Sequence, residues 1–75
     1  MIGLNAATVG AEYRIIRIDM EKSQRLHLYE LGIREGATVI PKMAGPLRDP
    51  VAYEVKDTVI ALRKRDTEKI EVEPV

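Results

Sequence analysis

Residues 26–36 read LHLYELGIREG, and residues 45–50 read GPLRDP. The first run predicts a short amphipathic helix, because Leu28 and Leu31 lie three residues apart on one face. Gly32 follows at the position where a helix can end in a left-handed conformation, which glycine adopts readily. A strand and a proline-bounded turn come next. This order of elements indicates a small β-rich domain that carries one helix.

Length and composition restrict the fold. A chain of 75 residues forms one domain spanning residues 1–75. It has no cysteine, so neither a disulfide framework nor a thiolate metal site can stabilise it. The core must therefore come from the 45% of residues that are apolar, mostly Ile, Leu and Val. Because such a small core gives modest stability, contact with a partner or weak self-association would add to it.

The charge balance and the absence of long apolar runs bear on possible partners. Twelve basic and twelve acidic residues give a net charge of zero, whereas nucleic-acid binding favours a basic surplus. No apolar run approaches the roughly 18 residues that a membrane span requires. The N-terminus lacks the basic flank and apolar stretch of a signal peptide. We therefore expect a cytoplasmic protein that binds no nucleic acid and does not insert into a membrane.

Five short strands are expected, over residues 11–18, 37–43, 51–55, 58–63 and 70–72. A bulge near Arg17 would place three apolar side chains of the first strand on one face, namely Tyr13, Ile15 and Ile18. Pro41 cannot donate to a ladder, so its strand lies at an edge or has the proline at a bulge. The pattern predicts an all-β fold, a small barrel with one helix between the first two strands.

Three polar residues are expected to fix local structure. Ser23 is placed to cap the helix, which then runs to Leu31. Asp66 is placed to cap a single helical turn that runs to Lys69. Asp49 is expected to hold the turn of residues 44–50 through its side chain.

The chain resembles the FeoA family over nearly its whole length. The resemblance lies in the ordered set of motifs Leu28–Ile33 with Gly36 and Val39, the pairs Pro46-Leu47 and Asp49-Pro50, Ile60–Lys64, and Ile70–Val72. Gly45 stands where the family usually has alanine, and Arg48 stands where it usually has glycine. Since glycine favours left-handed backbone, the sequence leaves the conformation of this turn open.

The resemblance implies an SH3-like barrel and an accessory role in bacterial ferrous iron uptake. FeoA-like proteins are thought to dock on the cytoplasmic GTPase part of FeoB, the membrane transporter of ferrous iron. A similar domain ends the metal-dependent repressors of the DtxR type, so a metal-sensing module is one alternative. A nucleic-acid-binding barrel is another, because small barrels often bind RNA or DNA. The chain has no Phe or Trp to form a stacking platform.

His27 and Glu30 are the candidate metal ligands. They lie three residues apart, so both can face one ion on a helix, and Fe(II) or another divalent transition metal accepts such ligands. The chain has one histidine and no cysteine to complete a site. The alternative is an exposed polar pair on a helix surface. We expect no tightly bound cofactor and at most weak metal binding.

Six residues are candidates for partner contact. Leu26 and Tyr29 flank the apolar helix face and form an exposed patch unless a wide stripe buries them. Leu47 lies at the tip of a loop stiffened by prolines, which would lose little entropy on binding, or else packs on the barrel. The remaining candidates are Arg48 and Asp49 beside Leu47, and Arg63 in the basic run of residues 63–65.

An enzyme is not expected. Ser23 is the only serine, and the single histidine has no thiol partner. Carboxylates such as Glu71 and Glu73 alternate along a strand rather than surrounding a cleft. A thin-cored domain of this size also has little room for a substrate pocket.

Overall fold

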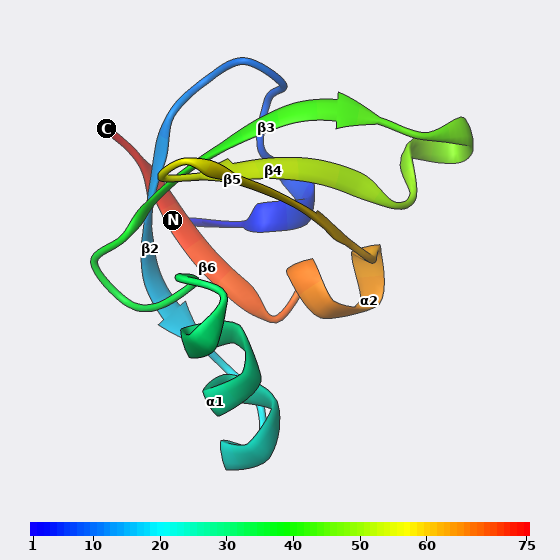
Figure 1. Cartoon of the computed structure of the whole chain (residues 1–75). Helices are drawn as coiled ribbons and strands as arrows, with labels where there is room; N and C mark the ends of the chain where they lie inside the picture. Colours follow the sequence, from blue (N-terminus) through cyan, green and yellow to red (C-terminus); the bar gives the residue numbers. More distant parts are fainter.

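Six antiparallel strands form one bent sheet in the computed structural model, which describes all residues 1–75 (Figure 1). The sheet order is β1-β6-β2-β3-β4-β5. The strands are β1 (Ile2–Gly3), β2 (Tyr13–Ile18), β3 (Thr38–Ala44), β4 (Val51–Val55), β5 (Thr58–Leu62) and β6 (Ile70–Pro74). The helices are α1 (Lys22–Glu30) and α2 (Lys64–Thr67), with 3₁₀ turns at Leu4–Ala6 and Pro46–Arg48. The expected all-β class with one helix after the first long strand is confirmed.

The N-terminal segment contributes more than the sequence indicated. Ile2 and Gly3 pair with Val72 and Glu71 of β6, which adds a sixth strand. Leu4 follows with only 1% of its surface exposed. A two-residue strand has no periodicity of its own, so only the neighbouring β6 reveals it.

The bulge expected in β2 is confirmed. The register against β6 shifts between Ile15 and Arg17. As a result, apolar side chains on both sides of the shift turn into the core, where Tyr13, Ile15 and Ile18 are all buried. An extra residue of this kind bends the strand, and β2 lies between β6 and β3 in the sheet.

Pro41 lies at a bulge rather than at a sheet edge. The strand β3 has β2 on one side and β4 on the other. Its register against β4 shifts between Pro41 and Met43. The carbonyl of Pro41 accepts a hydrogen bond from the Gly10 amide at 2.8 Å, which satisfies the one hydrogen-bonding group that a proline backbone has.

The expected cap at Ser23 is wrong. The N-cap of α1 is Glu21, and no side chain there bonds to the helix. Because the helix begins at Lys22, Ser23 lies inside its first turn. An exposed helix end can leave its first N–H groups to water, which explains why no side-chain cap is required.

The expected glycine stop is confirmed. Gly32 has φ +92°, and its amide donates to the Tyr29 carbonyl at 3.0 Å. The Ile33 amide donates to the Leu28 carbonyl at 2.9 Å, which completes a Schellman-type ending. Ile33 is 1% exposed and packs in the same core cluster as Leu28.

Leu31 does not form part of the buried face of the helix. Its side chain is 37% exposed, whereas Leu28 is 6% exposed. Leu31 is the C-cap residue, where the chain leaves the helix. The buried position that the spacing assigned to Leu31 is filled by Ile33, because the left-handed turn at Gly32 sends the chain back towards the core.

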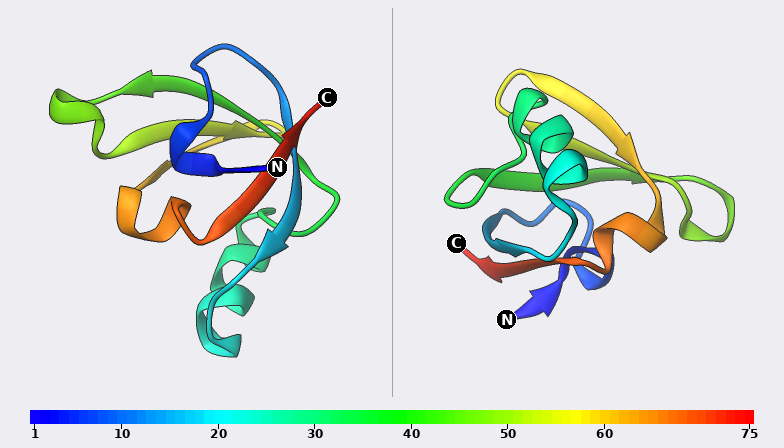
Figure 2. Two further views of the ribbon diagram at one scale, coloured as in Figure 1. Left: turned by 180° about the vertical axis from the view of Figure 1, so that it is seen from behind. Right: turned by 90° about the horizontal axis from the view of Figure 1, so that it is seen from below.

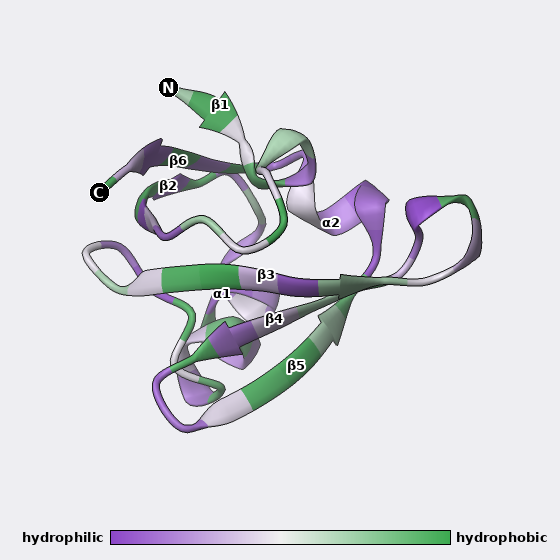
Figure 3. Cartoon of the chain, turned by 90° about the horizontal axis from the view of Figure 1, so that it is seen from above, coloured by the Kyte–Doolittle hydropathy of each residue, from purple (hydrophilic) through white to green (hydrophobic).

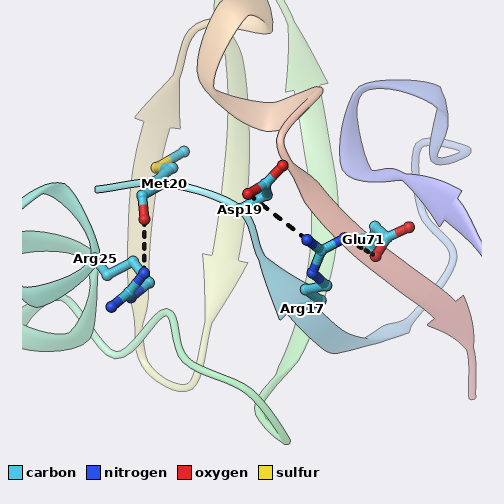
Figure 4. A network of polar contacts seen from close by, with 5 residues as sticks. All are labelled: Arg17, Asp19, Met20, Arg25 and Glu71. Atoms are coloured by element: carbon cyan, nitrogen blue, oxygen red, sulfur yellow. Dashed lines mark hydrogen bonds and ion pairs between the residues drawn. The ribbon is translucent and has the colours of Figure 1, made fainter. Parts of the chain in front are cut away.

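The segment between β2 and α1 is held by polar contacts (Figure 4). Arg25 Nη1 donates to the Met20 carbonyl at 2.7 Å. Arg17 on β2 lies 3.7 Å from the Asp19 carboxylate and 3.5 Å from that of Glu71 on β6. These ion pairs are largely exposed, so each contributes less than about 1 kcal/mol.

The strands of the C-terminal half lie close to the expected positions. Lys56 and Asp57 form the two-residue turn between β4 and β5. The expected cap at Asp66 is wrong: the helical turn α2 begins after Arg63, ends at Thr67 and contains Asp66, and the free Lys64 amide bonds to Asp49 instead. The buried core spans every strand except β1, together with the helix α1 and the N-terminal 3₁₀ turn: Leu4, Ala7, Tyr13, Ile15, Ile18, Leu28, Ile33, Val39, Tyr53, Val55, Leu62, Ile70 and Val72. No helix has the length and apolar character needed to cross a lipid bilayer.

Candidate functional site

The loop of residues 44–50 is closed by its own backbone. The Gly45 amide donates to the Pro50 carbonyl, and the Arg48 amide donates to the Gly45 carbonyl, both at 2.9 Å. Leu47 and Arg48 have φ values of +58° and +61°. The turn thus keeps left-handed backbone although Arg48 replaces the usual glycine. Left-handed backbone costs a non-glycine residue on the order of 1 kcal/mol, which the surrounding contacts must offset.

Asp49 connects this loop to α2. Its Oδ1 accepts a hydrogen bond from the Lys64 backbone amide at 3.0 Å. We expected the Asp49 side chain to hold its own turn, but it instead satisfies a free N–H in the first turn of a distant helix. Arg63 lies next to the loop that carries Arg48, because the ladder pairs Val51 with Leu62 and Asp49 bonds to Lys64.

A small pocket of about 140 Å³ lies between the loop and α2. Arg48 and Lys64 supply positive charge at its wall, and Tyr53 is 1% exposed beneath it. Burial raises the pKa of the Tyr53 hydroxyl, while hydrogen bonding to Thr67 and the nearby Arg48 oppose that rise. Asn5, Leu47, Val51 and Thr67 complete the lining.

The Leu47 side chain is 99% exposed at the loop tip. The sequence allowed Leu47 either to be exposed at the loop tip or to pack on the barrel. The structure shows the exposed arrangement. Met43, at the β3 end of the loop, is also exposed, by 70%. The loop region therefore presents apolar side chains beside the cations Arg48 and Arg63.

The two helix candidates differ in accessibility. Leu26 is 49% exposed, whereas Tyr29 is half-buried. The Tyr29 hydroxyl donates to Glu35 Oε1 at 2.8 Å, and the Arg34 guanidinium lies 5.6 Å from the centre of its ring. The hydrogen bond raises the pKa of Tyr29 and lowers the pKa of Glu35. Tyr29 is thus held by the following turn, and Leu26 is the more accessible side chain.

The candidate docking residues do not form one surface. Figure 1 shows α1 and the loop of residues 44–50 at different ends of the molecule, and both views of Figure 2 agree. The structure brings together Leu47, Arg48, Asp49 and Arg63 at one end. Leu26 and Tyr29 lie on the separate helix.

His27 and Glu30 are both exposed on α1, and no ion pair or hydrogen bond joins them. The His27 side chain instead lines a pocket of about 320 Å³ between the two helices, opposite Asp66. Met20, Ser23, Gln24 and Leu28 line the rest. No group of three or more His, Cys, Asp or Glu side chains that could hold a metal is present. Asp66 was missed as a neighbour of His27 because they are 39 positions apart by number (66 − 27) and no local pattern joins them.

Comparison with known proteins shows which family this fold resembles. The model of the FeoA domain matches residues 2–74. A curated Porphyromonas gingivalis protein, an Fe(2+) transport protein A/Fe(2+) transporter FeoB fusion, is 36% identical over 70 residues. That match covers 93% of this chain but 8% of the fusion protein. The chain thus spans a small part of that relative.

Solved structures agree with the family match. Iron(II) transport protein A from Clostridium thermocellum superposes with a TM-score of 0.92 at 30% identity, over 99% of this chain and 46% of that one. FeoA from Stenotrophomonas maltophilia, solved with zinc and described as a prokaryotic SH3 domain protein, has a TM-score of 0.79 at 22% identity. That match covers 97% of this chain and 91% of that one, and it confirms the expected SH3-like fold. With the family model matched from residue 2 to residue 74, the chain belongs to the FeoA family.

Proposed function

We propose that this chain is an accessory domain of bacterial ferrous iron uptake that docks on the cytoplasmic GTPase part of a FeoB-type transporter. The observation that carries the proposal is the similarity over 70 residues to a protein in which transport protein A and the FeoB transporter are fused. A fusion holds two modules at high effective concentration, which favours contact between them. On this proposal the chain works in the cytoplasm.

The loop of residues 44–50 is the main docking element. Leu47 offers an apolar side chain that is 99% exposed. The loop is closed by backbone bonds and anchored through Asp49 to α2, so little conformational entropy is lost when a partner binds. Arg48 and Arg63 add positive charge, which favours an acidic partner surface.

Leu26 and Tyr29 form a second, weaker candidate surface on α1. Because this helix lies away from the loop, one flat partner surface would not cover both regions (Figure 1). The two regions therefore have to be tested separately.

Titration of the protein with the full-length transporter in lipid nanodiscs tests the proposal. We expect Leu47→Asp to weaken binding by at least about tenfold, because a charge would replace an apolar contact at the interface. The matched control is Val9→Asp, which places the same charge at another exposed apolar position, 43% exposed. Arg63→Ala should weaken binding, whereas Arg65→Ala in the same basic run should not.

Two results would contradict this proposal. If the unaltered protein does not bind the transporter, the proposed docking function is wrong. If Leu47→Asp and Val9→Asp weaken binding equally, the loop is not the docking site. A loss with Leu26→Asp alone would transfer the docking surface to α1.

The metal-binding prediction at His27 and Glu30 stays a prediction. These two side chains supply at most two ligands, and a structural zinc site takes four. A complete site would need donors from a partner or a second copy. An NMR titration with Zn(II) that follows the His27 ring tests this, and an unchanged ring signal would exclude His27 as a ligand. Detectable affinity of the isolated chain would favour the metal-sensing alternative.

A further inference from the structure

The strand β5 is an unpaired edge of the sheet. It lies last in the sheet order and is paired only with β4. Figure 3 shows it as an outer strand that is hydrophobic along most of its length. No hydrogen bond outside the β4 ladder involves residues 58–62. Val59 is 63% exposed, and Thr58 and Ala61 are exposed as well, so most of this strand is accessible to solvent.

The register shows which backbone groups are free. Val55 and Thr58 close the two-residue hairpin and therefore form a hydrogen-bonded pair. Hydrogen-bonded pairs alternate along an antiparallel ladder, so Ile60 and Leu62 also bond to β4. The N–H and C=O groups of Val59 and Ala61 consequently point away from the sheet.

This edge lacks the usual protection against further pairing. The strand reads TVIAL and contains no charged residue and no proline. Its register against β4 runs without a bulge, unlike those of β2 and β3. The opposite edge, β1, has two residues and offers little to pair with. Natural sheets normally protect a longer exposed edge with charges, proline or bulges.

We propose that β5 pairs antiparallel with β5 of a second copy of this chain, about a two-fold axis through Ile60. In this register Val59 lies opposite Ala61 of the second copy. Each such pair exchanges both N–H···O=C bonds, which uses the free groups on the edge. The sheets of the two copies then become continuous.

The charged residues that flank β5 favour a second copy of this chain as the partner of the strand. Asp57 precedes the strand and Arg63 follows it. In the two-fold register the turn residue Asp57 of each copy lies beside Arg63 of the other, so opposite charges meet at both ends of the ladder. Neither residue has an ion-pair partner within its own chain. The contact uses the same surface on both copies, so it closes as a dimer.

The ladder is limited in length, and this limits its strength. The ladder cannot extend further, because Lys56 lies in the hairpin turn with φ +54° and Lys64 begins α2. A five-residue strand on each side buries less surface than a stable dimer interface requires. We therefore expect a weak dimer that forms with rising concentration and that salt weakens further.

Sedimentation equilibrium over a concentration series tests the charge pairing. The weight-average mass should rise from 8.4 kDa towards twice that value. Asp57→Arg and Arg63→Asp should each weaken dimerisation by about tenfold, because each places like charges at both ends of the ladder. The double variant Asp57→Arg with Arg63→Asp should restore it. Arg65→Asp is the matched control, since it makes the same charge change outside the ladder.

The backbone contact is tested by Ala61→Pro. Proline removes an N–H that faces away from β4, so the intramolecular ladder stays intact while the contact between copies is lost. In the unaltered protein the amide signals of Val59 and Ala61 should shift with concentration, and that of Ile60 should shift less. If Ala61→Pro does not fold, the charge-reversal variants at Asp57 and Arg63 still test the proposed dimer.

Three results would overturn this proposal. These are a monomer at every concentration, a dimer that the single charge reversals leave unchanged, and a double variant that fails to recover dimerisation. Concentration-dependent shifts confined to α1 would assign any dimer to another surface.

Discussion

The Asp49 carboxylate accepts a hydrogen bond from the Lys64 backbone amide at 3.0 Å, although the two residues are 15 positions apart. This one contact joins the loop of residues 44–50 to the first turn of α2. It aligns Arg48 on the loop with the Arg63-Lys64 segment. The β4–β5 ladder already places Val51, at the base of the loop, opposite Leu62, just before α2, and the Asp49 bond adds a side-chain contact between the two segments.

Asp49→Ala should lower the free energy of unfolding by about 1 kcal/mol, because it leaves an N–H in the first turn of α2 without its acceptor. Asp49→Asn should cost less, since the amide oxygen can still accept the bond. Urea unfolding followed by circular dichroism measures both. Equal losses from the two variants would show that charge, rather than the hydrogen bond, stabilises this contact.

Gly32→Ala should destabilise the protein by about 1 kcal/mol, because the residue at this position has φ +92°. A Cβ there would lie 3.5 Å from Val55 Cγ1, an ordinary contact, so the cost is one of backbone conformation. Gly32→Asn should lose less than alanine, since asparagine tolerates left-handed backbone better. Thermal unfolding gives the comparison, and a neutral Gly32→Ala would contradict this account of the helix end.

Leu28→Ala and Leu31→Ala should differ sharply. Leu28 is 6% exposed in the core, so its truncation should cost about 2–5 kcal/mol. Leu31 is 37% exposed at the C-cap, and its truncation should cost roughly 1 kcal/mol or less. Urea unfolding of both variants provides the measurement. Equal losses of unfolding free energy would instead support the prediction from helical spacing that Leu28 and Leu31 are both buried.

Tyr29→Phe should raise the pKa of Glu35, because the hydrogen bond from the Tyr29 hydroxyl lowers it. The pKa of Glu35 is lower in the folded than in the unfolded protein. The bond therefore stabilises the protein fully above the unfolded pKa, and that stabilisation is lost as pH falls through the folded pKa. The stability difference between the two proteins should narrow at acid pH.

An NMR pH titration of the Glu35 carboxyl carbon measures this change directly. Tyr13→Phe is the matched control, since the Tyr13 oxygen accepts its bond from the Thr8 amide and does not contact Glu35. A Glu35 pKa that is equal in the unaltered protein and in Tyr29→Phe would remove the hydrogen bond as the cause.

Local features of this fold were predictable because their signals are short-range. The bulge in β2 follows from apolar residues that no single period-two pattern can bury together, namely Tyr13, Ile15 and Ile18. The stop at Gly32 and the tight turn at Lys56-Asp57 are likewise set by a few adjacent residues. In each case the physical cause lies within one element and its neighbours.

The candidate site was predictable only in part. The exposed tip at Leu47 was one of two open alternatives, because a turn sequence does not indicate which way its apolar side chain points. The contact of Asp49 with Lys64 and the shared pocket of His27 and Asp66 have no local signature. They arise where separate elements meet.

The sequence by itself determined the class of fold, most strand positions, the bulge and the glycine stop, since backbone preference and hydrophobic period act over a few residues. Only the tertiary structure decided that Leu31 is exposed, that the N-terminus adds β1, and that Asp49 holds α2. Each of these depends on packing between distant segments, where burial and long-range hydrogen bonds outweigh local propensity.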